Sequence, residues 1–552
     1  MSASNVWFIT GASTGFGREM TEVALASGHK VVATLRKPEL LHELEAKYPD
    51  TLLSLRLDVT VASEIDDAFK KAKERFGRID VVFNNAGVSV AGEVESVPEE
   101  EARSAFEVLF WGAARVSRVA MEYFRQNEPI GGRLFQLSSN LGVKAKPGTG
   151  WYSAAKFALE GLSEALAEEV NPAWNIGVCL VEPGPFRTEI GRNIDLDESR
   201  THPAYRNSNT ASRSFVTRVA QSNTLFDGDA KKAASVFLKL ADLPLAEFPL
   251  RLPLHRMAVR VIQAKGESLI ASAKKWERSS SGLGRHTAEA ALAAGHKVVA
   301  TLRKPEVLKN LVARYPQTLL TIKLDVTNTD DVDAAFAQAK AHFGRIDVVM
   351  NNAGYALVGE VEATSEKDAR EEFEVLFWGA AKVTKVALQY FRENKPSGGR
   401  LLQMGSEFGI LATPGAAYYS AAKFALSGLT ESLSRELDPA WNIRVTIIEA
   451  GPFVTDIGRN TELLPVHPAY TNPELGGNKF RKWAVEQIVD GSPEKAAQIF
   501  IRLANLPVDE APLRFPIHRE AVESERIKAR ELLETAKKWE SWSNNIYIDV
   551  KN

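Results

Sequence analysis

The chain has one cysteine among its 552 residues, so a disulfide within the chain is impossible. This residue, Cys179, lies in the apolar run 176–181, a context more typical of a core side chain than of a nucleophile or a ligand. The nine histidines lack the spacing of metal ligands, and the sequence therefore predicts no metal site. No apolar stretch approaches the roughly 18 residues that span a bilayer. We therefore expect no membrane partner.

An excess of charge of one sign is also missing. The 68 Lys and Arg residues nearly balance the 70 Asp and Glu residues, and the net charge is -2. A chain so balanced has no electrostatic footprint for nucleic acid. The first residues run into a β-branched segment without the charged and apolar pattern of a secretion signal. We expect a cytoplasmic protein.

One long repeat organises the sequence. Residues 15–192 return from position 282, and the spacing is constant: Asn84 and Asn351 are 267 positions apart, as are Tyr152 and Tyr419. A period of this length indicates two tandem domains rather than a solenoid. We place the domains at 1–277 and 278–552.

Short β-branched runs alternate with amphipathic stretches in the first copy. The expected strands are 6–10, 30–35, 53–58, 81–84, 133–138 and 176–181, and the expected helices are 15–27, 61–76, 99–126 and 152–170. This alternation predicts a parallel sheet with helices on both faces, so the fold class is α/β with two Rossmann-type doubly wound domains. Ligands then bind at the carboxyl ends of the strands. The polar segment from Ile190 to Asn209 is either a lid over this edge or a variable surface loop.

Three features predict a dinucleotide site. A glycine-rich turn from Thr10 to Gly17 joins the first strand to the first helix and permits close approach of a pyrophosphate. Arg36 follows the second strand where an NAD enzyme would carry an acidic residue, which favours NADP(H) over NAD(H). The alternative for Arg36 is a solvated surface residue. Asp58 after the third strand either accepts from the adenine amino group or caps the following helix.

A second group of residues predicts acid–base chemistry. Tyr152 and Lys156 lie one helical turn apart, and the ammonium is expected to lower the pKa of the phenol. Ser139 lies 13 positions before Tyr152 at a strand end, and the sequence Asn-Asn-Ala-Gly at 84–87 ends another strand. The second copy repeats the group as Ser406, Tyr419 and Lys423.

With these motifs and the segment Pro183 to Thr188 in this order, nearly the whole chain resembles two fused members of the short-chain dehydrogenase/reductase family. The resemblance implies that Tyr152 exchanges a proton with the substrate oxygen, that Ser139 holds this oxygen, and that Lys156 binds the nicotinamide ribose. It implies direct hydride transfer between nicotinamide and a carbonyl carbon. The implied cofactor-binding residues are Gly11, Ser13, Gly15, Phe16, Gly17, Arg36, Asp58, Val59, Asn85, Ala86, Gly87, Tyr152, Lys156, Pro183, Gly184, Phe186 and Thr188.

Both copies depart from the family at one position. Where a fourth catalytic residue, an asparagine, is common in the family, this chain has Leu109 and, in the second copy, Leu376. Because both copies share the leucine, the change predates the duplication. It puts a water-mediated proton relay in doubt, unless a backbone carbonyl serves the relay instead.

The second copy also lacks the first strand and the first glycine. The positions that align with Val6 to Gly11 belong to the tail of the first copy, and Arg278 stands where Gly11 would be. The first strand of a doubly wound sheet is central, so its loss leaves two neighbouring strands unpaired. We therefore predict weak or no cofactor binding by the second copy. The apolar alternation at 545–550 predicts a strand that fills the vacant position; a misjoined pair of reading frames is the alternative origin.

These observations predict an NADP(H)-dependent oxidoreductase that interconverts a ketone or aldehyde and an alcohol, acting on CH–OH donors with NADP+ as acceptor, mainly in the first copy. The alternative is a silent dinucleotide-binding sensor or scaffold, above all for the second copy. An epimerase or dehydratase is disfavoured because each copy lacks a larger substrate domain. Trp151 and Phe186 favour a small apolar substrate. In the family the helices expected at 99–126 and 152–170 often mediate assembly, which predicts an intrachain pseudo-dimer or a homo-oligomer.

Overall fold

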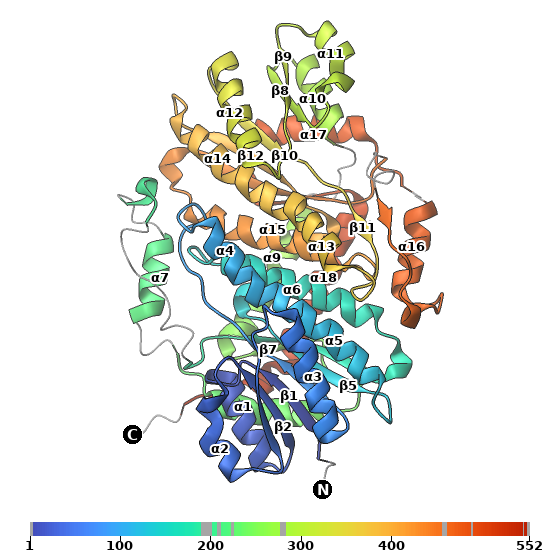
Figure 1. Cartoon of the computed structure of the whole chain (residues 1–552). Helices are drawn as coiled ribbons and strands as arrows, with labels where there is room; N and C mark the ends of the chain where they lie inside the picture. The colour runs from blue at the N-terminus through green and yellow to red at the C-terminus, as the bar shows by residue number, and fades with distance from the viewer. Residues whose placement is uncertain are drawn as a thin grey trace.

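The computed structural model describes residues 4–188, 201–206, 211–221, 226–275, 283–454, 461–486, 489–544 and 546–548. Each copy forms one lobe of strands and helices, the first blue to green and the second yellow to red in Figure 1. Arg278 and most of the segment from Ile190 to Asn209 lie outside the described residues. Among the helices that the structure describes, none has the length and apolar character needed to cross a membrane.

The first copy is a seven-stranded parallel sheet in the order β3-β2-β1-β4-β5-β6-β7. Its strands are β1 (Val6–Thr10), β2 (Lys30–Leu35), β3 (Leu52–Arg56), β4 (Val81–Asn84), β5 (Gly132–Leu137), β6 (Ile176–Pro183) and β7 (Arg251–Leu254). The main helices are α1 (Gly15–Ala26), α3 (Ala62–Phe76), α4 (Glu99–Phe106), α5 (Ala113–Arg125), α6 (Gly150–Glu169), α8 (Ala230–Ala241) and α9 (Arg256–Lys275).

Helices cover both faces of this sheet because successive strand residues point to opposite sides. Phe8 packs in one apolar core with Phe69 of α3, whereas Trp7 and Ile9 pack in a second core with Phe237 of α8. Strands buried on both faces explain the nearly continuous apolar runs in the sequence. The predicted Rossmann-type fold is confirmed.

The sheet of the second copy is split. Strands β8 (Val298–Leu302) and β9 (Leu319–Lys323) form one pair, while β10 (Val348–Asn351), β12 (Gly399–Met404), β13 (Ile443–Ala450) and β15 (Arg514–Ile517) form a separate four-stranded sheet. In the first copy β1 joins the two corresponding parts by pairing with both β2 and β4. Within the described ranges no strand joins β8 to β10, so the predicted truncation is confirmed.

The C-terminal segment does not fill this gap, and our expectation for it is wrong. Ile546 is fully buried in a core of the first copy together with Phe186 and Phe237, and Tyr547 forms an antiparallel bridge with Gly228. The apolar alternation correctly indicated an extended segment with one buried face. It carried no information about which copy that face would pack against.

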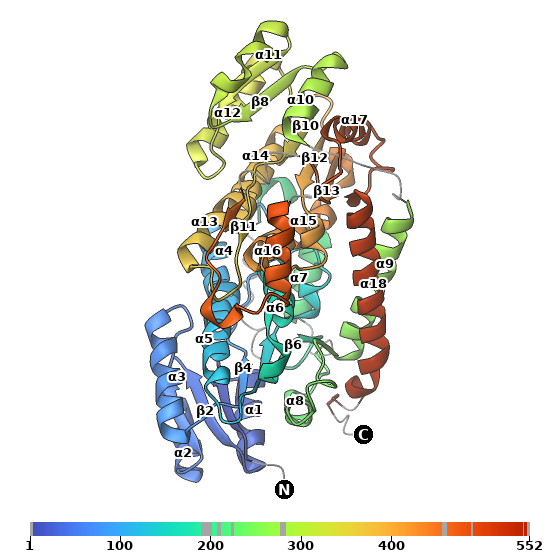
Figure 2. The ribbon, with the colours of Figure 1, turned by 90° about the vertical axis from the view of Figure 1, so that its right-hand side faces the viewer.

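Long helices join the two copies within the chain. Helix α6 packs along α15 (Ala417–Glu436), and α9 packs along α18 (Arg519–Trp539), as Figure 2 shows. The first pair of helices approaches closely at two glycines. A Cβ added at Gly161 would lie 3.0 Å from Phe424, and one added at Gly428 would lie 2.9 Å from Phe157. The expected contact between these long helices is therefore present inside one chain.

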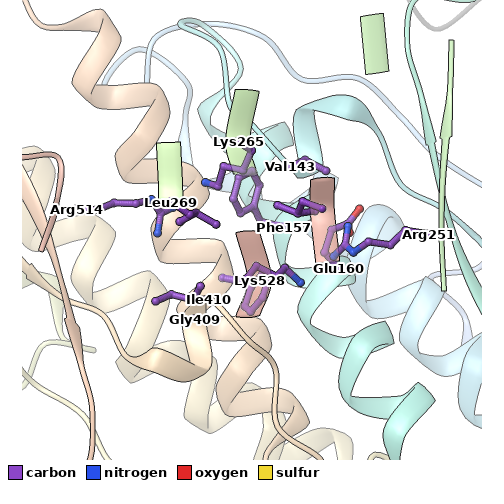
Figure 3. Close-up of a pocket in the computed structure, with 13 residues that line it drawn as sticks. Val143, Phe157, Glu160, Arg251, Lys265, Leu269, Gly409, Ile410, Arg514 and Lys528 are labelled. Carbon is purple, nitrogen blue, oxygen red and sulfur yellow. The ribbon is translucent and has the colours of Figure 1, made fainter. Parts of the chain in front are cut away.

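A cavity of about 30 Å³ lies at this junction and is lined by matching residues of both copies. Figure 3 shows Arg514 of the second copy and Arg251 of the first at opposite ends of the cavity, with Lys265 and Lys528 between them. The lysines exchange partners across the junction, because Lys265 pairs with Glu431 and Lys528 with Glu164. A cavity of this size holds about one water molecule, so it belongs to the packing of the two copies rather than to a substrate site.

The split sheet gives a matched pair of variants. Val81 of β4 is 1% exposed, whereas its counterpart Val348 of β10 is 43% exposed. Val81→Asp places an unpaired carboxylate in the core and should lower the free energy of unfolding by about 3–5 kcal/mol. Val348→Asp should change it by less than about 0.5 kcal/mol. Urea unfolding of the full chain measures the free energy of unfolding of both variants. Equal destabilisation by the two substitutions would contradict the exposure of Val348 at a sheet edge.

Candidate active site

The glycine turn lies at the carboxyl end of the central strand β1. Gly11 and Gly15 have φ values of +67° and +56°, which favour glycine. A Cβ on Gly17 would lie 2.3 Å from the carbonyl oxygen of Gly11. Helix α1 starts here, and the side chain of its N-cap residue Thr14 makes no capping hydrogen bond. The residues therefore fit a pyrophosphate held against the first turn of α1.

The residues that follow β4 form hydrogen bonds with this turn. The side-chain amide of Asn85 donates to the carbonyl oxygens of Thr10 at 2.9 Å and Gly11 at 3.2 Å. The backbone N–H groups of Asn85 and Ala86 donate to the Thr10 hydroxyl at 2.8 and 3.0 Å. The Asn-Asn-Ala-Gly sequence thus holds the turn to the neighbouring strand.

The segment after β6 closes over the same turn. A Cβ on Gly15 would lie 3.3 Å from the side chain of Thr188, and the rings of Phe16 and Phe186 are 4.8 Å apart. The structure therefore brings Pro183 to Thr188 beside the glycine turn, although these residues are separated by more than half of the first copy in sequence.

Arg36 and Asp58 lie at the ends of the adjacent strands. Arg36 is exposed directly after β2. The Asp58 carboxylate accepts from the backbone N–H of Thr60 at 3.0 Å and from its hydroxyl at 2.8 Å. Burial acts to raise the pKa of Asp58, but these hydrogen bonds and the charge of Arg36 outweigh it, and the pKa is lowered. Asp58 does not cap helix α3, whose N-cap residue is Val61.

Two more of the predicted cofactor residues support the site from the interior. Val59 is buried against Gly112, where an added Cβ would lie 2.8 Å from the valine side chain. A Cβ on Gly87 would lie 3.5 Å from Leu109. Both residues therefore fix the backbone at the strand ends.

The predicted acid–base residues meet at the end of β5. The Ser139 side chain lies beside the Tyr152 hydroxyl, and the Lys156 ammonium donates to the carbonyl oxygen of Leu137 at 2.7 Å. Burial raises the pKa of Tyr152 to about 12, with the Ser139 side chain acting in the opposite direction. Burial also lowers the pKa of Lys156 to about 8. Tyr152 is therefore a neutral phenol at pH 7, ready to donate a proton.

This result corrects the expected tyrosine pKa. We expected the charge of Lys156 to lower the pKa of Tyr152, but desolvation of the phenolate is the larger effect in the structure. Lys156 is desolvated as well, and its ammonium is directed at a strand carbonyl. The spacing in sequence showed that the two groups share a helix face, but it could not show how dry that face is.

Leu109 lies in a π-helical turn, η2 (Glu107–Gly112), and is fully buried in the apolar core. The second copy repeats the turn as η9 (Glu374–Gly379), with Leu376 buried in the same way. The leucine thus offers no polar group where the family commonly has asparagine. A relay through a backbone carbonyl stays a prediction.

Trp151 does not line a substrate site. Its ring stacks on Trp378 of the second copy at 5.6 Å, and its indole N–H donates to the carbonyl oxygen of Val94 at 3.2 Å. The use of Trp151 to infer an apolar substrate is therefore wrong. Its position on α6, one residue from Tyr152, turns its side chain about 100° around the helix axis, toward the junction between the copies.

The second copy keeps the same geometry around its own tyrosine. The Ser406 side chain lies beside the Tyr419 hydroxyl, and the Lys423 ammonium donates to the carbonyl oxygen of Met404 at 2.9 Å. Burial raises the pKa of Tyr419 and lowers that of Lys423 to about 8. The local acid–base geometry therefore does not depend on the missing strand.

Two buried acids that sequence reasoning missed distinguish this second site. Glu372 and Glu407 stand where the first copy has Ala105 and Asn140, and burial raises the pKa of each to about 8. Both carboxyl groups contribute to the raised pKa of Tyr419. Comparing the two copies position by position would have found them, since a buried acid replaces a smaller or neutral residue each time.

Comparison with known protein families agrees with the fold. A family model described as short chain dehydrogenase matches residues 5–199 and 279–463. The chain belongs to this family of oxidoreductases and contains two copies of its domain.

Individual relatives align with one copy. Oxidoreductase calM from Penicillium decumbens is 41% identical over 273 residues, which cover 48% of this chain and 88% of that protein. An NADPH-dependent 3-dehydrocapnine reductase from Ornithobacterium rhinotracheale is 34% identical over 186 residues, covering 33% of this chain and 65% of the relative. The crystal structure of a short-chain dehydrogenase from Streptomyces avermitilis has 37% identity and a TM-score of 0.45, and covers 50% of this chain and 97% of its own.

The glycine turn can be tested with a matched pair. Gly17→Ala forces a methyl group against the carbonyl of Gly11 and should weaken NADPH binding on the order of tenfold to a hundredfold, because the turn must shift. Its counterpart Gly284→Ala alters a turn that lacks its strand and should leave the affinity unchanged. Isothermal titration with NADPH measures both, and a loss in Gly284→Ala alone would contradict a site in the first copy.

Proposed function

We propose that the first copy is an NADP(H)-dependent oxidoreductase that interconverts a ketone or aldehyde and the corresponding alcohol. The placement of Ser139, Tyr152 and Lys156 together at the same strand-end edge as the glycine turn carries the proposal. In parallel α/β sheets this edge is where ligands bind.

Each residue has a role in the proposed reduction. Ser139 holds the carbonyl oxygen of the substrate, and Tyr152 donates its proton to that oxygen as charge develops there. Lys156 holds the ribose next to the nicotinamide. When bound, the nicotinamide supplies the hydride that reduces the carbonyl carbon. The alcohol product carries the proton of Tyr152 on oxygen, and the reverse reaction returns it.

The preference for NADP(H) is supported by the exposed Arg36 beside the end of β2. A guanidinium there suits a 2′-phosphate, and the absence of an acidic residue removes the usual acceptor for a free 2′-hydroxyl. The similarity to the NADPH-dependent 3-dehydrocapnine reductase of Ornithobacterium rhinotracheale also supports this preference.

For the second copy we propose a silent, supporting role. Its acid–base residues are in place, but the strand and the glycine that would receive a pyrophosphate are missing from the sequence. Glu372 and Glu407 add buried acidic groups close to Tyr419. A carboxyl group that ionises there would oppose the negative charge that develops on a substrate oxygen.

The acid–base assignment predicts different outcomes for two equivalent substitutions. Tyr152→Phe removes the proton donor and should lower the NADPH-dependent reduction of a reactive ketone or aldehyde by about 10²–10⁴-fold, with NADPH affinity retained. Tyr419→Phe should leave the rate unchanged. The rate is measured from the loss of NADPH absorbance. A rate that falls only in Tyr419→Phe would contradict the assignment of activity to the first copy.

The cofactor preference has its own test. Arg36→Ala removes a charge-assisted hydrogen bond worth about 1.5–3 kcal/mol, so NADPH affinity should fall about tenfold or more while NADH affinity stays constant. Arg303→Ala, the equivalent change in the second copy, serves as the control. An equal loss of affinity for both cofactors in Arg36→Ala would show that Arg36 does not read the 2′-phosphate.

A further inference from the structure

The C-terminal segment of the second copy lies against the first copy, beside the loop Pro183–Thr188, which contains four of the expected cofactor-binding residues. Helix α18 runs from the second copy toward the first, as Figure 2 shows. Beyond it, Ser543 is buried and bonds with the end of β7: its hydroxyl accepts from the backbone N–H of His255 at 3.1 Å and donates to the carbonyl oxygen of Pro253 at 2.9 Å.

Residues 546–548 then pair with the backbone of the first copy. The N–H of Asp229 donates to the carbonyl oxygen of Ile546 at 2.6 Å, and the N–H of Ile548 donates to that of Asp227 at 2.8 Å. The ammonium of Lys232 donates to the carbonyl oxygen of Tyr547 at 2.8 Å. The segment is therefore held by backbone bonds on both sides of Tyr547.

Tyr547 reaches the loop through His255. The rings of Tyr547 and His255 are 5.1 Å apart, and the Tyr547 hydroxyl accepts from the N–H of Arg256 at 2.8 Å. His255 has a φ of +108°, a conformation that a non-glycine residue adopts only when its surroundings hold it there. His518, the counterpart of His255 in the second copy, has a φ of +111° and packs in the same way against Phe453 and Gly451. The fold of each copy therefore sets this conformation, and Tyr547 and Ser543 add further contacts to His255.

His255 in turn contacts two residues of the loop. Its ring lies 5.8 Å from that of Phe186, and a Cβ on Gly184 would lie 2.7 Å from its Nδ1 atom. Gly228, which pairs with Tyr547, also pairs with Phe186. Two continuous routes therefore connect the C-terminal segment to Pro183–Thr188, one through His255 and one through Gly228.

The tails of the two copies repeat with an offset of 263, so Tyr547 corresponds to Gly284. That glycine is the first residue of helix α10 (Gly284–Ala293) of the second copy. The position that corresponds to Tyr547 therefore lies in a helix rather than in an extended segment.

We propose that residues 546–548 of the second copy are positioning residues for the first copy: their contacts stabilise His255 against Gly184 and Phe186 and so favour the loop conformation that binds the cofactor. This inference rests on the proposed function. It gives the truncated second copy a task in the reaction, since it supplies a part of the neighbouring site without binding a cofactor itself.

Variants of the full chain test this positioning. Tyr547→Ala and a chain that ends at residue 544 should each raise the NADPH dissociation constant about tenfold, the usual size of coupling between two sites. Tyr547→Phe keeps the ring on His255 and should retain most of the affinity. Asn544→Ala changes an exposed neighbour and is the matched control. Circular-dichroism melting verifies that each variant is folded.

A second measurement needs no substitution. Because coupling is reciprocal, NADPH should slow hydrogen exchange of the Ile548 amide by the same factor of about ten by which the segment strengthens NADPH binding. A purely structural role for the segment predicts exchange that is independent of NADPH.

The outcomes separate this inference from the proposed function. Unchanged NADPH affinity in Tyr547→Ala and in the shortened chain, together with NADPH-independent exchange at Ile548, would overturn the positioning role alone. An unaltered chain that binds no NADPH would overturn the proposed function, and the inference with it.

Discussion

Strand β1 is the element on which the rest of the first copy depends. It pairs with β2 on one side and β4 on the other, and its end carries the glycine turn. Thr10, its last residue, accepts the backbone N–H groups that fasten the end of β4 to the turn. A central strand therefore supplies sheet continuity and cofactor geometry together, because the turn can be placed only where the strand ends.

The second copy shows the effect of losing this strand. Its sheet separates into two parts, and the edge residue Val348 becomes exposed. Ser406 nevertheless stays beside Tyr419, and the hydrogen bond from the lysine to a strand carbonyl persists. Acid–base geometry is built by β12 and α15, whereas cofactor geometry is built by the missing β1 region, so the two halves of a site can be lost separately.

Packing between the copies offers a reason why a truncated domain is retained. Helix α15 buries α6, the helix that carries Tyr152 and Lys156, and the two helices approach at Gly161 and Gly428. Arg125 and Glu362 form a further ion pair across the junction. The proposed catalytic helix is thus covered by the second copy, and the C-terminal segment beside His255 extends this support to the cofactor side.

Much of the fold and of the candidate site could be predicted from the sequence. The repeat, the alternation of strands and helices, and the missing first strand were all readable because they depend on local pattern and on the spacing of residues along the chain. Ser139, Tyr152 and Lys156 were found in the same way. Aligning the two copies also shows the acidic replacements Glu372 and Glu407, whereas their burial is seen only in the structure.

Tertiary structure alone decided the remaining features. The pKa of Tyr152 is set by burial, which depends on packing from distant segments rather than on the lysine four residues away. Trp151 faces the second copy, and Ile546 packs in the first, although the sequence around each was compatible with other partners. Local pattern determines which face of a segment is apolar, but the surface that covers this face is chosen by the whole fold, because apolar burial is non-directional.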